Sequence, residues 1–315
     1  MRIRDKKALP IGLSDFKSII EENYYYVDKT DLISNLLYDG AKVNLFTRPR
    51  RFGKTLNMSM LKHFFDIENG AENRKLFENL KISDSEYMTE QGKYPVIFIS
   101  FKNLEEEDWN NCLRKIKNLI GDLYNEFEFL RKKLNKRDLK FFDSIWMEEE
   151  DVVWESALKN LTRYLYNYYG ERKVIVLIDE YDTPIIQSYQ EGYYKKAILF
   201  FKNFYGDALK DNSYLQYGVM TGILRIAKEG IFSGLNNLKV DTIFNERYSD
   251  FFGLTEKEVT KAVRYYELEY IHHPTSDRET PKDLWKYAKD NPLVSISNCR
   301  GYVFVDSLFD SFDSE

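Results

Sequence analysis

Five short apolar runs alternate with amphipathic stretches along the chain, and this alternation limits the fold more than any other feature. Strands of a parallel sheet that is covered on both faces show as continuous apolar runs, because neither face meets water. Such strands separated by helices are typical of an α/β sheet. We therefore predict a parallel sheet of about five strands, with helices on both faces, from the runs Val43–Phe46, Pro95–Phe101, Val174–Asp179, Tyr217–Thr221 and Val240–Phe244.

The predicted helices follow from apolar residues that recur at three- and four-residue spacing. The first directly follows the loop after Val43–Phe46 and includes Leu56, Met60 and Phe64. Three longer ones are predicted at Cys112–Leu130, Trp154–Tyr169 and about Tyr193–Leu209.

Composition excludes several classes of protein. The 315 residues carry 46 Lys and Arg against 51 Asp and Glu, a net charge of −5, so no overall positive field attracts DNA or an anionic membrane. Two cysteines and three histidines form no disulfide or metal-site pattern. No apolar window is long enough to span a bilayer, and no secretory signal is visible. We expect a cytoplasmic protein without a membrane partner. The basic stretch Arg131–Lys140 fits a solvated helix end better than a nucleic-acid site.

A candidate phosphate-binding loop, Thr47–Thr55, lies between the first predicted strand and its helix. Such a loop needs a helix N-terminus, a lysine for the β- and γ-phosphates and a hydroxyl for Mg²⁺. Its last three residues meet this need, but Arg48 stands where the motif has its first glycine, so the loop must bend by another path. A chance tripeptide inside an arginine-rich surface loop is the alternative. The predicted nucleotide-binding residues are Arg48, Arg50, Arg51, Phe52, Gly53, Lys54 and Thr55.

Acidic and hydroxyl side chains end two further predicted strands. Asp179 can hold the metal that the Thr55 hydroxyl also contacts, and Glu180 can polarise a water molecule as general base. The alternative is that both acids merely begin a turn. Thr221 is a candidate sensor of the γ-phosphate or a simple cap, and Arg225 is a candidate catalytic residue or a surface residue.

These motifs resemble the AAA-ATPase-like family of bacterial P-loop proteins, which usually carry a C-terminal PD-(D/E)XK nuclease-like domain. The resemblance implies an additional-strand, AAA-like fold and a loop that lacks the first glycine. It also implies that Lys54 and Thr55 bind phosphate and Mg²⁺, and that Asp179 and Glu180 are the metal-binding and catalytic acids. It covers about residues 8–259 and rests on Leu9–Phe16, Asn23–Thr30, Arg48–Thr55, Leu177–Asp182, Thr221–Lys228, Ile231–Asn237 and Tyr248–Thr255.

The tail departs from this family. A nuclease of that superfamily needs an acid on one strand and an acid-x-Lys on the next, and no such strand follows Thr255. We therefore predict an ATPase domain at 1–255 and a short helical, truncated or divergent region at 256–315, including a helix at Leu284–Ala288 and at most one strand at Gly301–Asp306. The Tyr25–Thr30 segment is expected either near the nucleotide base or as an aromatic anchor.

The sequence thus predicts a protein that binds ATP and Mg²⁺ and hydrolyses the nucleotide. The catalytic candidates are Glu180, Thr221 and Arg225, and the metal ligands are Thr55 and Asp179. Two alternatives stay open: a nucleotide-dependent switch with negligible turnover, and a scaffold whose loop arginines contact nucleic acid. A homo-oligomer in which Arg225 completes a neighbour's site is a further expectation.

Overall fold

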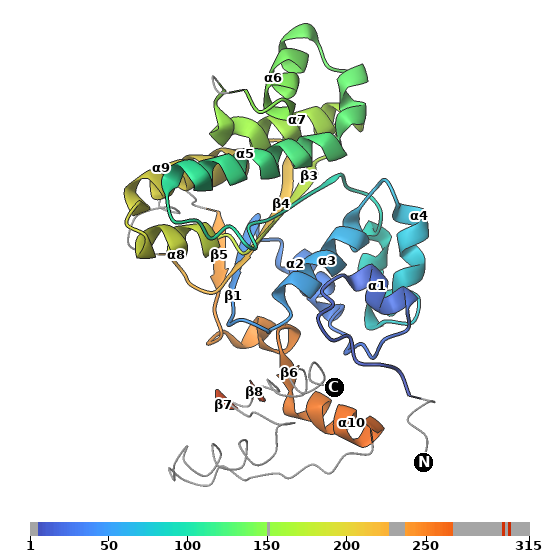
Figure 1. Ribbon diagram of the computed structural model, residues 1–315. Coiled ribbons are helices and arrows are strands. Elements are labelled where there is room, and N and C mark those ends of the chain that lie inside the picture. The colour runs from blue at the N-terminus through green and yellow to red at the C-terminus, as the bar shows by residue number, and fades with distance from the viewer. Residues whose placement is uncertain (1–5, 150–151, 227–236, 267–297, 300–301, 304–315) are drawn as a thin grey trace.

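A computed structural model describes residues 6–149, 152–226, 237–266, 298–299 and 302–303. Its centre is a five-stranded, all-parallel sheet in the order β2-β3-β4-β1-β5 (Figure 1). The α/β prediction is confirmed, and β4 is the additional strand between β1 and β3. The strands are β1 (Val43–Thr47), β2 (Val96–Ser100), β3 (Val174–Asp179), β4 (Leu215–Gly222) and β5 (Leu238–Asp241).

Helices pack against both faces of the sheet, as the apolar strands require. In β3 the side chains of Val174, Val176 and Ile178 belong to one core, and those of Ile175 and Leu177 belong to the other. This alternation is the period of two that a strand imposes on its side chains. Every residue of β3 is buried, which explains its unbroken apolar sequence.

Two groups of helices supply the two cores, and Figure 1 shows them on opposite sides of the sheet. One group consists of α1 (Phe16–Glu21), α2 (Asp31–Asp39), α3 (Lys54–Phe65) and α4 (Gly70–Asn73). The other consists of α5 (Trp109–Glu126), α6 (Lys136–Trp146), α7 (Ala157–Tyr168), α8 (Thr183–Gln190) and α9 (Tyr194–Leu209). Short 3₁₀ helices are η2 (Arg74–Phe77), η3 (Lys81–Asp84), η4 (Glu86–Glu90), η5 (Glu128–Lys132), η6 (Trp154–Ser156) and η7 (Glu246–Phe251).

Two predicted elements have different ends in the structure. The helix predicted to reach Leu130 ends at Glu126 and continues as the 3₁₀ turn η5. The predicted bounds of the last strand, Val240–Phe244, are wrong by two to three residues. Strand β5 spans Leu238–Asp241, and Phe244 lies beyond its end with 71% of its surface exposed.

The described part of the C-terminal region contains β6 (Leu254–Thr255), α10 (Glu256–Tyr266), β7 (Asn298–Cys299) and β8 (Tyr302–Val303), with the strands in the order β6-β8-β7. The ammonium of Lys29, on the segment before α2, contacts the Glu258 carboxylate on α10 at 2.6 Å. The predicted helix at Leu284–Ala288 lies outside the described residues. The proposed division at residue 255 remains a prediction.

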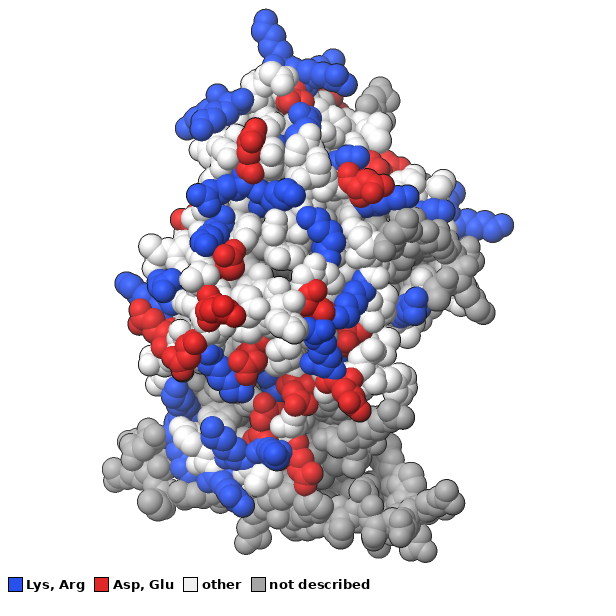
Figure 2. Space-filling view, turned by 180° about the vertical axis from the view of Figure 1, so that it is seen from behind, with Lys and Arg blue, Asp and Glu red and all other residues white. Residues whose placement is uncertain are grey.

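The surface carries charges of both signs, in line with the small net charge. Figure 2 shows Lys and Arg mixed with Asp and Glu over one face, with basic residues gathered at the upper end. Figure 1 places α6 at that end. In the predicted basic stretch, the Arg131 guanidinium contacts Asp143 at 3.0 Å and lies over the Trp146 ring. None of the helices within the described residues is long and apolar enough to cross a membrane.

Candidate functional site

The polar residues singled out in the sequence meet at one edge of the sheet, where its parallel strands end. β1 leads into the Thr47–Thr55 loop, and β3 and β4 end beside it at Asp179 and Gly222. Ligands of open α/β sheets bind at this carboxyl edge. The parallel topology therefore brings residues from separate sequence motifs to one place.

The loop bends without the missing first glycine. The backbone N–H of Arg48 donates to the carbonyl of Gly222 at 2.9 Å, so Arg48 still continues the pairing of β1 with β4. The turn comes later, at Arg51 with φ 65° and at Gly53 with φ 70°, and both residues are left-handed. Gly53 is the N-cap of α3, whose first residue is Lys54. The amino end of a twelve-residue helix thus opens into the loop, as a phosphate site requires.

Lys54 is buried and bends back over its own loop. Its ammonium donates to the carbonyls of Arg48 and Pro49 at 3.1 and 2.9 Å. Burial lowers the pKa of Lys54, while the carboxylates of Glu180 and Asp179 raise it. These two hydrogen bonds hold the ammonium at the loop.

Asp179 is the centre of a hydroxyl cluster and is completely buried. Thr55 Oγ1 donates to its Oδ2 at 2.8 Å, and Thr221 Oγ1 donates to its Oδ1. Ser100 Oγ, at the end of β2, lies 3.4 Å from Oδ2. Thus the ends of three strands and the first turn of α3 converge on one carboxylate.

Glu180 follows Asp179 in a strained backbone conformation, with φ 53°. Burial raises the pKa of its carboxyl group, and the neighbouring Asp179 adds to the rise, while Lys54 and Lys102 oppose it. A left-handed non-glycine residue costs about 1–2 kcal/mol and is frequent at functional sites. The strained, half-buried carboxyl group is therefore suited to exchanging protons near the loop.

The loop after β4 is held by the residues that follow Glu180. Asp182 Oδ2 accepts the backbone N–H groups of Ile223 and Leu224 at 2.8 and 2.7 Å. The Tyr181 hydroxyl donates to the Leu224 carbonyl at 2.6 Å. This loop carries Arg225, which is exposed. Its predicted catalytic role therefore stays a prediction.

Arg48 does not fit its predicted phosphate contact in this structure. Its guanidinium is 1% exposed and pairs with the Asp241 carboxylate at 2.6 Å. It also donates to the Asp241 carbonyl at 3.0 Å and lies 4.8 Å from the centre of the Phe252 ring. We correct the expectation accordingly: Arg48 fastens the base of the loop to the segment 241–253.

Phe52 is likewise an anchor in the structure. Its ring is buried in the core around α3, and its carbonyl accepts the Gly253 N–H at 3.0 Å. The Asn57 side chain donates to the Phe251 carbonyl at 2.8 Å, which makes another link to the same segment. By contrast, Arg50 is 80% exposed and lies 4.0 Å from Glu105. Arg51 is also exposed.

The donor set at Asp179 fits Mg²⁺. Magnesium prefers hard oxygen ligands and is usually held by one or two carboxylates together with substrate phosphates. Asp179 and the Thr55 hydroxyl supply such oxygens, side by side, next to the loop. In the described ranges no group of three or more His, Cys, Asp or Glu residues forms a metal cage. Thr55 and Asp179 are thus the residues that could hold the ion.

Comparison with known proteins supplies the family. The family model described as "Predicted AAA-ATPase" matches residues 10–232, more than half of the chain. The chain belongs to this predicted AAA-ATPase family. Membership supports nucleotide binding as a coarse function.

A curated relative from Azotobacter chroococcum mcd 1, described as "Uncharacterized protein in vnfD 5'region", is 32% identical over 256 residues. The match covers 81% of this chain and 44% of the relative, so the chain spans less than half the length of that protein. No solved structure matches the chain.

Sequence reasoning missed two polar residues of this site. Ser100 ends the apolar run of β2 as a single hydroxyl, which is the same signal that identified Thr221 on β4. Asp182 stands in the acidic stretch after β3 but lacks a local pattern, since its partners lie about forty residues later.

Proposed function

We propose that the chain binds ATP with Mg²⁺ between the Thr47–Thr55 loop and Asp179, and that it hydrolyses the nucleotide. One observation carries the proposal: the Thr55 hydroxyl, next to Lys54, donates to the buried Asp179 carboxylate at 2.8 Å. This is the pairing of loop hydroxyl and strand-end acid that holds the metal in P-loop ATPases.

Each side chain has a role that its contacts support. Lys54 exchanges the Arg48 and Pro49 carbonyls for β- and γ-phosphate oxygens, which keeps the ammonium paired in both states. Glu180 orients the attacking water and accepts its proton. Thr221 donates a hydrogen bond to one oxygen of Asp179. From its place at the end of β4 it senses the γ-phosphate. A bound Mg²⁺ would neutralise phosphate charge as it develops.

Calorimetric titration of Mg-ATP, followed by a phosphate-release assay, tests this function. We expect saturable binding by the wild type and none by Lys54→Ala. Glu180→Gln should retain binding and lose turnover. Equal turnover by the wild type and Glu180→Gln would remove Glu180 from the mechanism, and a Lys54→Ala protein that binds Mg-ATP normally would refute the site.

The same measurements separate the alternatives. A regulatory switch would bind Mg-ATP and stabilise the fold without multiple turnover. A nucleic-acid scaffold would bind DNA in a salt-dependent manner and show no protection by ATP against heat. The burial of Arg48 weakens the scaffold hypothesis, because it withdraws one of the three loop arginines from any external polyanion. Phosphate release measured with and without DNA completes the comparison.

A further inference from the structure

A hollow of about 530 Å³ opens at the opposite edge of the sheet, at the amino ends of its strands. Lys42 precedes β1, Lys173 precedes β3 and Asn237 precedes β5, while the loop between α9 and β4 supplies Lys210, Asn212 and Ser213. We call these six residues the lysine hollow. Strand β1 has five residues, and a strand rises about 3.3 Å per residue, so the hollow lies roughly 16 Å from the phosphate loop. It is therefore separate from the proposed ATP site.

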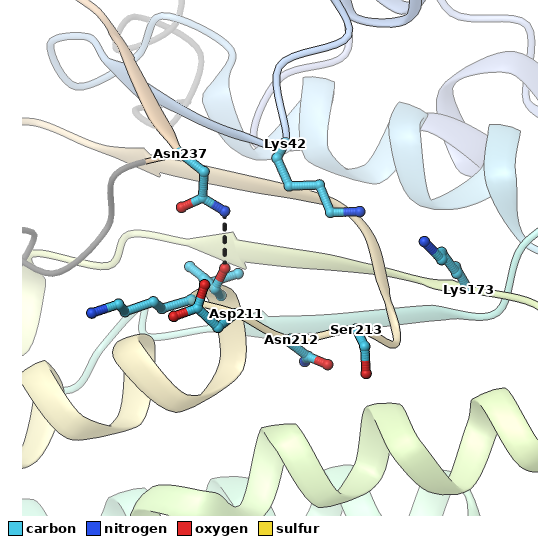
Figure 3. Close-up of a pocket in the computed structure, with 8 residues that line it drawn as sticks. Lys42, Lys173, Asp211, Asn212, Ser213 and Asn237 are labelled. Carbon is cyan, nitrogen blue, oxygen red and sulfur yellow. Dashed lines mark hydrogen bonds between the residues drawn. The ribbon is translucent and has the colours of Figure 1, made fainter.

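The hollow concentrates positive charge. Three lysines line it, against one carboxylate, that of Asp211. Figure 3 shows the ammonium groups of Lys42 and Lys173 pointing toward each other. Burial lowers the pKa of Lys42, and the charge of Lys173 lowers it further. The Lys42 ammonium donates to the carbonyl of Leu215, which is a neutral acceptor. An anion placed between the two lysines would relieve their repulsion.

An asparagine and an aspartate also border the hollow. The Asn237 side chain donates through Nδ2 to the Leu209 carbonyl at 3.3 Å (Figure 3). Its Oδ1 is buried and meets no donor in the part of the chain that the structure describes. Because this oxygen is buried, the acceptor that the hollow offers to a ligand hydroxyl is the exposed carboxylate of Asp211 instead.

Hydrogen bonds of Asn212 fix the turn between α9 and β4, which forms one wall of the hollow. Asn212 is buried, and its amide donates to the Thr162 hydroxyl at 3.0 Å and to the Ala208 carbonyl at 2.8 Å. Its Oδ1 accepts the Tyr214 N–H at 3.1 Å. These bonds fix the turn between α9 and β4, so the loop that carries Lys210 and Ser213 starts from a defined position.

We propose that the lysine hollow binds a small phosphorylated metabolite that carries hydroxyl groups. Lys42 and Lys173 contact the phosphate, and the exposed Asp211 carboxylate accepts a hydroxyl. Pockets for small molecules usually measure about 300–1,000 Å³, and the hollow falls within that range. The proposal is independent of ATP binding, because it uses no residue of the phosphate loop.

Ribose 5-phosphate is a suitable probe, with ribose as the uncharged control and ligand-observed NMR and calorimetry as the readouts on the full chain. We expect saturable binding of ribose 5-phosphate and none of ribose. Lys173→Met should weaken binding about tenfold or more, since it removes a charged hydrogen-bond donor from the phosphate. Because Lys173 is exposed, its replacement should leave the fold intact. The double variant Lys42→Met/Lys173→Met should abolish binding.

Two controls locate the bound probe. Lys195→Met removes the same charge near the start of α9, about 20 Å along the helix from the hollow, and should bind as the wild type does. Lys54→Ala should also bind ribose 5-phosphate normally. The proposal is overturned if ribose 5-phosphate shows no saturable binding, if ribose binds equally well, if Lys173→Met leaves affinity unchanged, or if Lys54→Ala alone abolishes binding. That last result would place the phosphate in the loop instead.

Discussion

Removing the guanidinium of Arg48 should destabilise the fold strongly, although Arg48 lies in a loop predicted to contact phosphate. Arg48→Met would leave the Asp241 carboxylate buried without its partner at 2.6 Å, and would free the Asp241 and Thr47 carbonyls, each 3.0 Å from the guanidinium. Breaking a buried ion pair from one side costs about 3–5 kcal/mol. Urea unfolding should show a loss of that size.

The partner variant should be milder. In Asp241→Asn the side-chain oxygen still accepts from Arg48, whose guanidinium also keeps the carbonyls of Thr47, Asp241 and Tyr248. We expect a loss of about 1–3 kcal/mol. In a double-mutant cycle, the combined variant should lose less than the sum of the single losses, by about 1–3 kcal/mol. Arg50→Met is the matched control, because its side chain is 80% exposed and should alter stability by no more than about 0.5 kcal/mol.

Nucleotide affinity distinguishes the two roles of Arg48. If Arg48 acts by holding the loop, Arg48→Met and Asp241→Asn should both weaken Mg-ATP binding in calorimetric titration. If Arg48 contacts phosphate, only the arginine variant should weaken it. A loss of stability below about 1 kcal/mol for Arg48→Met, with intact affinity in Asp241→Asn, would refute the structural role.

Three further predictions concern the acidic strand end. Burial raises the pKa of Glu180, so the ionised carboxylate is disfavoured in the fold, and without nucleotide Glu180→Gln should melt higher than the wild type at neutral pH; this advantage should vanish on acidification through the raised pKa. Thr221→Val leaves an oxygen of Asp179 unpaired, so urea unfolding should show a loss of about 1–3 kcal/mol and phosphate release should slow, whereas unchanged turnover would exclude the sensor role. Gly222→Ala places a methyl group 2.6 Å from Asp182 Oδ1 and from the Tyr181 ring, so it should lower the free energy of unfolding by about 1–3 kcal/mol, and an unaltered urea midpoint would contradict this.

The sequence predicts the sheet because its strands are buried on both faces, which is a local property. β3 was predicted with its observed bounds, since all its residues are buried. The predicted position of β5 is displaced, because the strand ends at Asp241, whose partner Arg48 lies 193 residues away in the sequence. Hydropathy within a window of a few residues contains no information about such a pairing.

The candidate site, like the sheet, is predicted only in part from local sequence patterns. The sequence predicts Lys54, Thr55 and Asp179 as one site, because two short motifs and a parallel topology together place them at one edge. It does not predict that Arg48 is buried, since charged residues are rarely fully buried unless paired. The pairing itself is visible only when the segment 241–253 is folded against the loop.

The missing first glycine and the buried arginine are two parts of one arrangement. A loop that turns at Arg51 instead of at a glycine stores about 1–2 kcal/mol of backbone strain, and the rest of the fold must hold that turn in place. Arg48 fixes the start of the loop to Asp241, and the Phe52 carbonyl fixes its end to the Gly253 N–H. The shape of the phosphate loop therefore depends on tertiary contacts with the segment 241–253, which leads directly into β6 and α10. The same segment leads into α10, which Lys29 contacts through Glu258, so one continuous stretch of chain joins the anchored loop of the proposed nucleotide site to that helix.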